Sequence, residues 1–224
     1  MNFSSYIDHT LLRPDTSETE IGRLCEEAVQ QGFASVCIPN YFLKFARRRL
    51  DALQGDHPKH RVFLGTVAGF PLGYATTAAK VEEIKRARND GADEIDMVIN
   101  IPAVTNANFN YLSQELDSCL MTARLNHLTF KLILENNLLP EDEHTFGRLC
   151  ELCRQYEPDF VKTGTGYAGP VQLEHVQKLR QALPDSIGVK ASGGIRTTEQ
   201  IAALIEAGAT RIGTSRALEM MVEA

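Results

Sequence analysis

Short apolar runs alternate with helix-patterned segments along the chain. Runs typical of β-strands lie at 5–10, 34–39, 61–67, 94–99, 128–134, 159–164, 187–192 and 210–215. Most of these runs are apolar at nearly every position, which indicates strands that are buried on both faces. The segments between them repeat apolar residues at helical spacing. Such alternation of strand and helix predicts a parallel sheet with right-handed crossovers.

The helical segments carry start and stop signals. Ser17 and Glu20 form an S-x-x-E capping box, and the apolar helical face that follows it stops at Gly32. Thr197 and Gln200 form a T-x-x-Q box in the same way. About eight strand–helix units in a chain of this length predict a (β/α)8 TIM barrel. The pattern alone leaves a doubly wound open sheet as the alternative.

The composition predicts one globular domain over residues 1–224. Of the 224 residues 43% are hydrophobic, and no linker-like stretch interrupts the repeat. The net charge of −6 gives no reason to expect a nucleic-acid or anionic-membrane partner. No apolar run approaches the roughly 20 residues of a membrane span. Five cysteines and the absence of a signal-peptide pattern at the start indicate a reduced, cytoplasmic protein.

Several other motifs are better explained by packing than by chemistry. Cys150 and Cys153 form a CxxC on a predicted helix with no second ligand pair, which favours core packing over zinc. The arginines at 47–49 lie on a predicted helix and are interpreted as a solvated face. The histidines show no metal-ligand spacing and no GxGxxG follows a first strand, so neither a metal nor a dinucleotide is expected.

Charged residues inside apolar strands are the main chemical signal. Lys162 and Lys190 each interrupt a strand that otherwise suits a core, and two chance surface lysines are the less favoured explanation. If the two strands are neighbours, both lysines face one cavity from similar depths. Like charge and desolvation then lower a lysine pKa and raise the fraction of free amine. A Schiff-base lysine that attacks a carbonyl requires this free amine.

Asp96 lies in a third apolar strand, at 94–99, and needs a cation, a hydrogen-bond donor or water as a partner. One interpretation is a structural ion pair with Lys131 or Lys190. The other is proton transfer, directly or through water, as a carbinolamine dehydrates and an enamine forms. The sequence leaves both open.

Glycine-rich segments follow the late strands, at 162–169, 191–200 and 210–216. Backbone N–H groups in such turns, with helix N-termini behind them, can hold a phosphate. Any one of these turns could equally serve only the tight backbone geometry that glycine permits. Three of them after consecutive late strands favour a phosphate site, which barrels commonly build there.

The chain resembles the deoxyribose-phosphate aldolases, the class I aldolases of the DeoC family. The resemblance rests on IDHTLLRPD, VCIPNYF, TVAGFPLG, AAKVEEIKRARNDGADEIDMVINI, KLILE, DFVKTGTGY, IGVKASGGIRT and AGATRIGTS, which span nearly the whole chain. It implies a (β/α)8 barrel that reversibly cleaves 2-deoxy-D-ribose 5-phosphate to acetaldehyde and D-glyceraldehyde 3-phosphate. It also implies that no metal or organic cofactor is needed, and it suggests a homodimer.

The resemblance assigns roles to individual residues. Lys162 matches the Schiff-base lysine, Lys190 the second lysine that lowers its pKa, and Asp96 the acid–base carboxylate. On the substrate side it implies Asp8, Lys131, Gly166, Gly193, Gly194 and Ser215.

Three departures concern the ends of the site. Gly164 stands where the family usually has a serine, and Arg216 follows Ser215 where a second serine is common. The chain also ends without the tyrosine-terminated tail of some members. Arg216 is therefore a candidate phosphate ligand. Two alternatives stay open: an aldolase with a different or unphosphorylated acceptor, and a silent barrel that binds a sugar phosphate or a protein.

Overall fold

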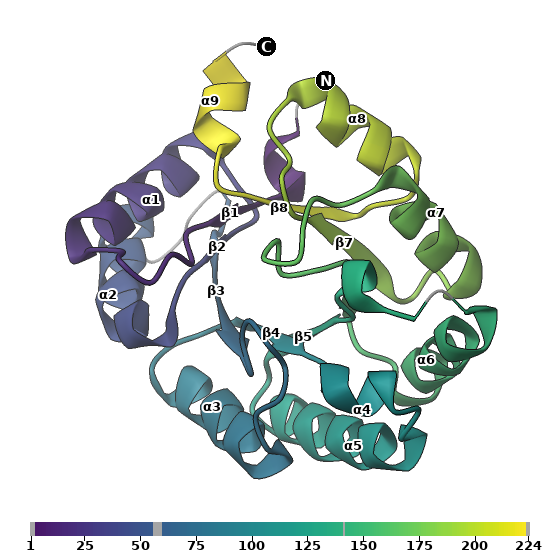
Figure 1. Ribbon diagram of the computed structural model, residues 1–224. Coiled ribbons are helices and arrows are strands. Elements are labelled where there is room, and N and C mark those ends of the chain that lie inside the picture. Colours follow the sequence, from purple (N-terminus) through teal and green to yellow (C-terminus); the bar gives the residue numbers. More distant parts are fainter. Residues whose placement is uncertain (1–2, 56–59, 141, 223–224) are drawn as a thin grey trace.

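The chain folds into a closed barrel of eight parallel strands. The computed structural model describes residues 3–55, 60–140 and 142–222 (Figure 1). The strands are β1 (Ile7–Thr10), β2 (Ser35–Cys37), β3 (Phe63–Ala68), β4 (Glu94–Val98), β5 (Thr129–Ile133), β6 (Phe160–Lys162), β7 (Gly188–Ser192) and β8 (Arg211–Thr214). Each strand pairs with the next in sequence, and β8 closes on β1 with Gly213 opposite Asp8. The predicted barrel is confirmed and the open sheet is excluded.

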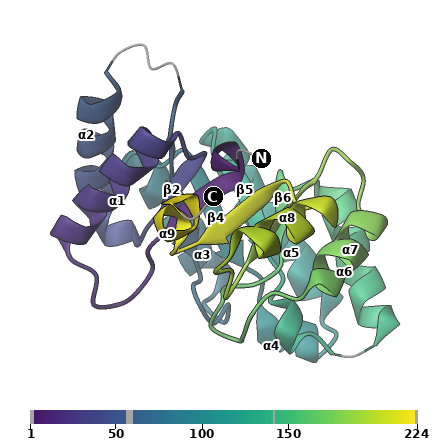
Figure 2. The ribbon, with the colours of Figure 1, turned by 90° about the horizontal axis from the view of Figure 1, so that it is seen from above.

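Helices form a ring outside the strands (Figures 1 and 2). They are α1 (Glu18–Gln31), α2 (Leu43–Gln54), α3 (Thr77–Asn89), α4 (Ile101–Thr105), α5 (Phe109–Leu125), α6 (Glu143–Tyr156), α7 (Leu173–Ala182), α8 (Thr198–Glu206) and α9 (Ala217–Val222). Short 3₁₀ turns lie at η1 (Ser4–Tyr6), η2 (Asn40–Phe42) and η3 (Asn136–Leu138). The short α4, which precedes α5 after β4, is an addition to the simple strand–helix repeat.

The capping signals of the sequence set the helix ends as predicted. The Ser17 side chain accepts the N–H of Glu20, whose carboxylate accepts the N–H of Ser17 in return, and α1 begins there. Thr197 and Gln200 make the same reciprocal pair at α8. Helix α1 ends at Gly32, whose φ of 66° is the left-handed conformation that glycine adopts without a Cβ penalty. These local rules fix where helices start and stop around the barrel.

The side chains of β4 alternate between an apolar layer outside the barrel and a polar cluster inside it. Ile95 and Met97 are fully buried in the apolar core that includes the inward faces of the helices. Glu94 and Asp96 alternate with them and are also buried, in a polar cluster inside the barrel. The apolar layer outside the strands therefore holds the barrel together, and the space within it is left for charged groups.

The cysteines of the CxxC were expected to pack in the core, and they do. All five cysteines are free and buried, including Cys150 and Cys153 on α6. In the 47–49 run on α2, Arg48 and Arg49 are exposed, as expected of a solvated face, whereas Arg47 is partly buried and bonded to Asp93. Within residues 3–55, 60–140 and 142–222 no cluster of three His, Cys, Asp or Glu side chains could hold a metal. No helix in that part of the chain combines the length and apolar character that a bilayer crossing requires.

Candidate active site

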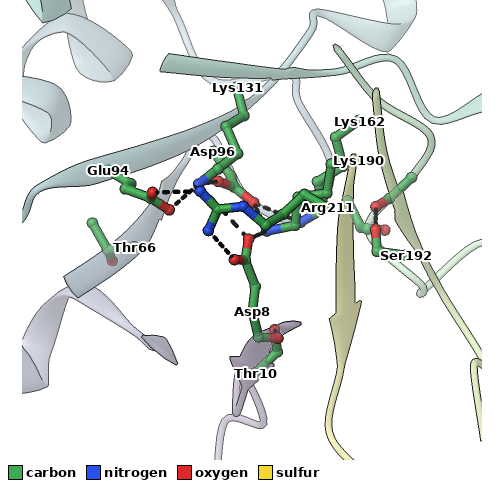
Figure 3. Close-up of polar contacts among 12 residues, drawn as sticks. Asp8, Thr10, Thr66, Glu94, Asp96, Lys131, Lys162, Lys190, Ser192 and Arg211 are labelled. Atoms are coloured by element: carbon green, nitrogen blue, oxygen red, sulfur yellow. Dashed lines mark hydrogen bonds and ion pairs between the residues drawn. The ribbon is translucent and has the colours of Figure 1, made fainter. Parts of the chain in front are cut away.

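The strand register brings the predicted lysines together. Lys162 on β6 is paired directly with Lys190 on β7, and Asp96 on β4 is paired with Lys131 on β5. All four side chains point into the barrel, where they converge on one polar cluster (Figure 3). At most 2% of any of them is exposed. The expectation that the two lysine strands are neighbours, with the lysines at similar depth, is confirmed.

Asp96 is the shared partner of all three lysines. Its Oδ1 accepts a hydrogen bond from Lys131 Nζ at 2.8 Å. Its Oδ2 accepts from Lys162 Nζ at 2.9 Å and from Lys190 Nζ at 2.7 Å. Burial alone would raise the pKa of Asp96, but the three ammonium groups hold it well below its usual range. Asp96 is therefore a buried anion that both pairs with Lys131 and lies within hydrogen-bond distance of Lys162.

The two strand lysines differ in charge state. Burial lowers the pKa of Lys162, and the neighbouring charge of Lys190 lowers it further against the attraction of Asp96. Burial also opposes the charge on Lys190, but the carboxylates of Asp8 and Asp96 outweigh it and raise the pKa of Lys190. Only Lys162 of this pair thus has the lowered pKa that a nucleophilic amine requires.

A second set of charged residues, Asp8, Glu94 and Arg211, lies next to the lysines. No role for Glu94 or Arg211 was predicted from the sequence. Arg211 at the start of β8 bonds Asp8 Oδ1 at 2.6 Å and Glu94 Oε1 at 3.1 Å. Asp8 Oδ2 lies 2.5 Å from Lys190 Nζ, and Glu94 Oε2 lies 2.6 Å from Lys131 Nζ. Glu94 could have been found, because it stands two residues before Asp96 and so faces the same way.

A cavity of about 850 Å³ opens at the carboxyl ends of the strands. Lys162 reaches it, as do the predicted phosphate residues Gly166, Gly193, Gly194, Ser215 and Arg216. Asp8, Lys131, Asp96 and Lys190 do not line it; they lie fully buried behind Lys162. The structure therefore separates the predicted set into residues that line the cavity and a buried charged group behind Lys162.

Two glycine turns lie against each other in the wall of the cavity. Gly166 has a φ of 87° and Gly193 a φ of 115°, values that side-chain-bearing residues rarely adopt. A β-carbon on Gly193 would stand 2.9 Å from the carbonyl oxygen of Gly169. These turns precede the helices rather than forming their first residues, since α7 begins at Leu173 and α8 at Thr198. The groups that could donate to an anion are therefore loop N–H groups, with the helices following behind them as expected.

Glu135 holds the turn that contains Gly166. This role was not predicted from the sequence. Glu135 follows β5 in a left-handed conformation with a φ of 58°, and 1% of it is exposed. Its Oε2 accepts the backbone N–H of Thr165 at 2.9 Å and also the Thr165 hydroxyl. Its Oε1 is buried without a hydrogen-bond partner and faces Gly164. A glutamate after a strand gives no sign of this role until the fold places it against the β6 loop.

Arg216 lies at the rim of the cavity beside an acidic residue. Its side chain is half exposed, and its Nη1 lies 3.5 Å from Glu219 Oε2, one turn further along the chain. An exposed pair of this kind is weak, so it leaves the guanidinium free to bind another anion. Arg216 thus lines the cavity directly before α9, the last helix, as expected from the sequence, and its role toward phosphate stays a prediction.

The fold and the site together define a Schiff-base aldolase barrel, in which a desolvated lysine opens onto a glycine-lined cavity. The chain belongs to the DeoC/LacD family of aldolases, whose model matches residues 4–217.

Individual relatives match over nearly their whole lengths. The chain is 41% identical to the deoxyribose-phosphate aldolase of Thermococcus gammatolerans, over 99% of this chain and 96% of that one. It is 42% identical to deoxyribose-phosphate aldolase 1 of Oceanobacillus iheyensis, over 96% and 93% of the two chains. Among solved structures, the tetrameric deoxyribose phosphate aldolase of Aeropyrum pernix superposes with a TM-score of 0.88 at 30% identity, covering 99% of this chain and 90% of that one.

Proposed function

We propose that this protein is a class I aldolase that reversibly cleaves 2-deoxy-D-ribose 5-phosphate into acetaldehyde and D-glyceraldehyde 3-phosphate. The observation that carries the proposal is Lys162, a buried lysine with a lowered pKa that nevertheless reaches the cavity. The relatives are named deoxyribose-phosphate aldolases, which supports 2-deoxy-D-ribose 5-phosphate as the substrate. We also infer that residues 1–224 form one aldolase domain, because the family model already covers 4–217.

Lys162 supplies the nucleophile. Its neutral amine attacks the aldehyde carbon of the open-chain sugar, and the resulting carbinolamine loses water to form a protonated Schiff base. Loss of the proton from the C3 hydroxyl then breaks the bond between C2 and C3. The electron pair of that bond flows into the imine to give an enamine, and D-glyceraldehyde 3-phosphate leaves. Protonation of the enamine at C2 and hydrolysis release acetaldehyde and regenerate the amine.

Asp96 and Lys190 are assigned supporting roles. Asp96 is ionised at neutral pH, so it can accept a proton, directly or through water, and return it. Lys190 keeps its own charge and so disfavours protonation of Lys162. Asp8 and Lys131 hold these groups in place from behind rather than touching the substrate. The chemistry uses the lysine amine and requires neither a metal nor an organic cofactor.

The phosphate end is assigned to the glycine turns and the residues after β8. Gly166, Gly193 and Gly194 line the cavity with backbone that can approach an anion closely. Ser215 and Arg216 face the same space. A second candidate function, an aldolase of the same mechanism with an unphosphorylated acceptor, is favoured by the missing hydroxyl at Gly164 and by Glu219 beside Arg216.

Cellular setting and assembly follow by inference. Five free, buried cysteines suit a reducing compartment, so we place the enzyme in the cytoplasm. The homodimer suggested by family resemblance stays a prediction, and the Aeropyrum pernix relative is described as tetrameric. Light scattering of the purified protein measures its oligomeric state.

The function is tested by borohydride trapping. Incubation of the protein with acetaldehyde and borohydride, followed by peptide mass mapping, is expected to modify Lys162 irreversibly. Lys162→Ala should abolish both trapping and turnover of 2-deoxyribose 5-phosphate, and the exposed Lys178→Ala should keep both. Trapping at an unchanged rate in Lys162→Ala would move the Schiff base to Lys190. No trapping in the wild type would favour the silent barrel.

A further inference from the structure

Seven charged side chains inside the barrel form one network of ion pairs (Figure 3). The carboxylates are Asp8, Glu94 and Asp96, and the cations are Lys131, Lys162, Lys190 and Arg211. If every member were ionised, the network would hold one positive charge in excess. A buried excess charge is costly, so the network favours the loss of one proton from one of its cations.

The pattern of contacts shows which cation bears the excess. Lys131 contacts Glu94 and Asp96, and Asp8 lies 3.9 Å from its Nζ. Lys190 contacts Asp8 and Asp96, and Arg211 contacts Asp8 and Glu94. Lys162 contacts Asp96 only, through an oxygen that it shares with Lys190. Among the described residues, each of the other three cations thus has at least two carboxylates, whereas Lys162 has one carboxylate oxygen, which it shares with Lys190.

We propose that Arg211 and Glu94 are positioning residues that decide the charge state of the nucleophile. Arg211 occupies one oxygen of Asp8 and one of Glu94, so neither carboxylate is free to compensate Lys162. It also supplies the cation that makes the network one charge too positive. Glu94 has the opposite effect on the charge of the network, because its carboxylate pairs with Lys131 and Arg211 and stabilises both as cations. Neither residue lines the cavity, so both act through Lys162.

The other groups described around Lys162 leave the net charge of the network unchanged. Asp96 on β4 and Lys190 on β7 are members of the network, as are Lys131 on β5 and Asp8 on β1. On β2 the Cys37 thiol also faces Lys162, and burial raises its pKa to about 11, so it is neutral near pH 7. The pKa values of Lys131 and Arg211 are raised by their carboxylate partners against the effect of burial, which agrees with their remaining charged.

The test, which rests on the proposed Schiff-base function, is the pH at which borohydride trapping of acetaldehyde reaches half its maximal rate. Arg211→Met removes a cation, so Lys162 should keep its proton to higher pH and the midpoint should rise by about one unit. Glu94→Gln removes an anion, and the midpoint should fall by a similar amount. The double variant restores the excess of one positive charge and should return the midpoint to near the wild-type value.

Opposite shifts with recovery in the double variant cannot come from loosened packing alone, which would weaken both single variants alike. Arg148→Met and Glu151→Gln, which break an exposed ion pair on α6, are the matched controls and should leave the midpoint unchanged. Midpoints that stay the same in Arg211→Met and Glu94→Gln, or that move in the same direction, would overturn the inference while trapping at Lys162 persists. Absence of trapping in the wild type would instead overturn the proposed function.

Discussion

Gly164 lies directly against the buried carboxylate of Glu135. A β-carbon added to Gly164 would stand 2.6 Å from Glu135 Oε1, well inside ordinary van der Waals contact. Neither partner is free to withdraw easily. Glu135 Oε2 is held by the N–H and hydroxyl of Thr165, and the carbonyl oxygen of Gly164 accepts the Ser192 hydroxyl at 2.5 Å. The glycine that replaces the usual family serine is therefore matched to this position of Glu135.

Gly164→Ser should consequently impair the enzyme, although it restores the residue that is common in the family. Overpacking of this kind costs about 1–3 kcal/mol, which corresponds to about five- to a hundredfold in kcat/KM if it is expressed in the loop that lines the cavity. The measurement is kcat/KM on 2-deoxyribose 5-phosphate together with the melting temperature. Gly147→Ala on α6 is the matched control, because a β-carbon there meets nothing within 4 Å.

The role of Glu135 can be separated from the loss of a hydroxyl near the substrate. In a Glu135→Ala background the obstacle to a serine side chain at position 164 is gone, so adding Gly164→Ser should cost little more. Full, multiplicative losses in the double variant would show that the two positions do not interact. A gain in kcat/KM on Gly164→Ser alone would show that Glu135 rearranges and that the serine hydroxyl is useful here.

Lys190→Leu is expected to shift the pH profile upward. Lys162 reacts only as the free amine, so the trapping rate rises with pH through the pKa of Lys162. That pKa is lowered by burial and by the charge of Lys190. Leucine removes the charge and keeps the burial, so the pKa rises and the rate reaches half its maximum at a higher pH. A profile that coincides with the wild type would show that the two lysines do not interact.

Asp96→Asn is expected to reduce both activity and stability. The sequence offered proton transfer and a structural ion pair as alternatives, but the side chain contacts Lys131 and Lys162 at once. The amide cannot accept a proton, so turnover per folded molecule should fall by at least about a hundredfold. Loss of one member of a buried pair typically costs about 3–5 kcal/mol, which chemical denaturation would reveal. Unchanged activity per folded molecule would leave only the structural role.

The sequence was informative where a charge contradicts its local pattern. Lys162 and Lys190 could be predicted because a lysine in the middle of an apolar strand needs a reason to be there. Arg211 and Glu135 could not, because each lies at the edge of an apolar run, where a charged residue usually meets water. The contact that gives Arg211 its role forms only in the closed barrel, where its guanidinium bonds Asp8 on the first strand. Register and loop contacts between distant segments are set by the whole fold.

Arg216 is expected to bind the phosphate group of the substrate. Arg216 lines the cavity with a half-exposed side chain, and its only ion-pair partner in the described part of the chain is Glu219 at 3.5 Å. A phosphate that accepts two hydrogen bonds from the guanidinium would be a stronger partner than this distant carboxylate. The wild type should therefore favour 2-deoxyribose 5-phosphate over free 2-deoxyribose.

Arg216→Ser should weaken that preference selectively. Loss of a charged hydrogen bond costs about 1.5–3 kcal/mol, which is roughly ten- to a hundredfold in kcat/KM on the phosphorylated sugar, whereas the free sugar should be unaffected. Glu219→Gln should act in the opposite direction, because it removes the carboxylate that competes with phosphate for the guanidinium. Equal kcat/KM of the wild type and Arg216→Ser on both sugars would remove Arg216 from phosphate recognition. A wild-type preference for the free sugar would instead promote the aldolase with an unphosphorylated acceptor.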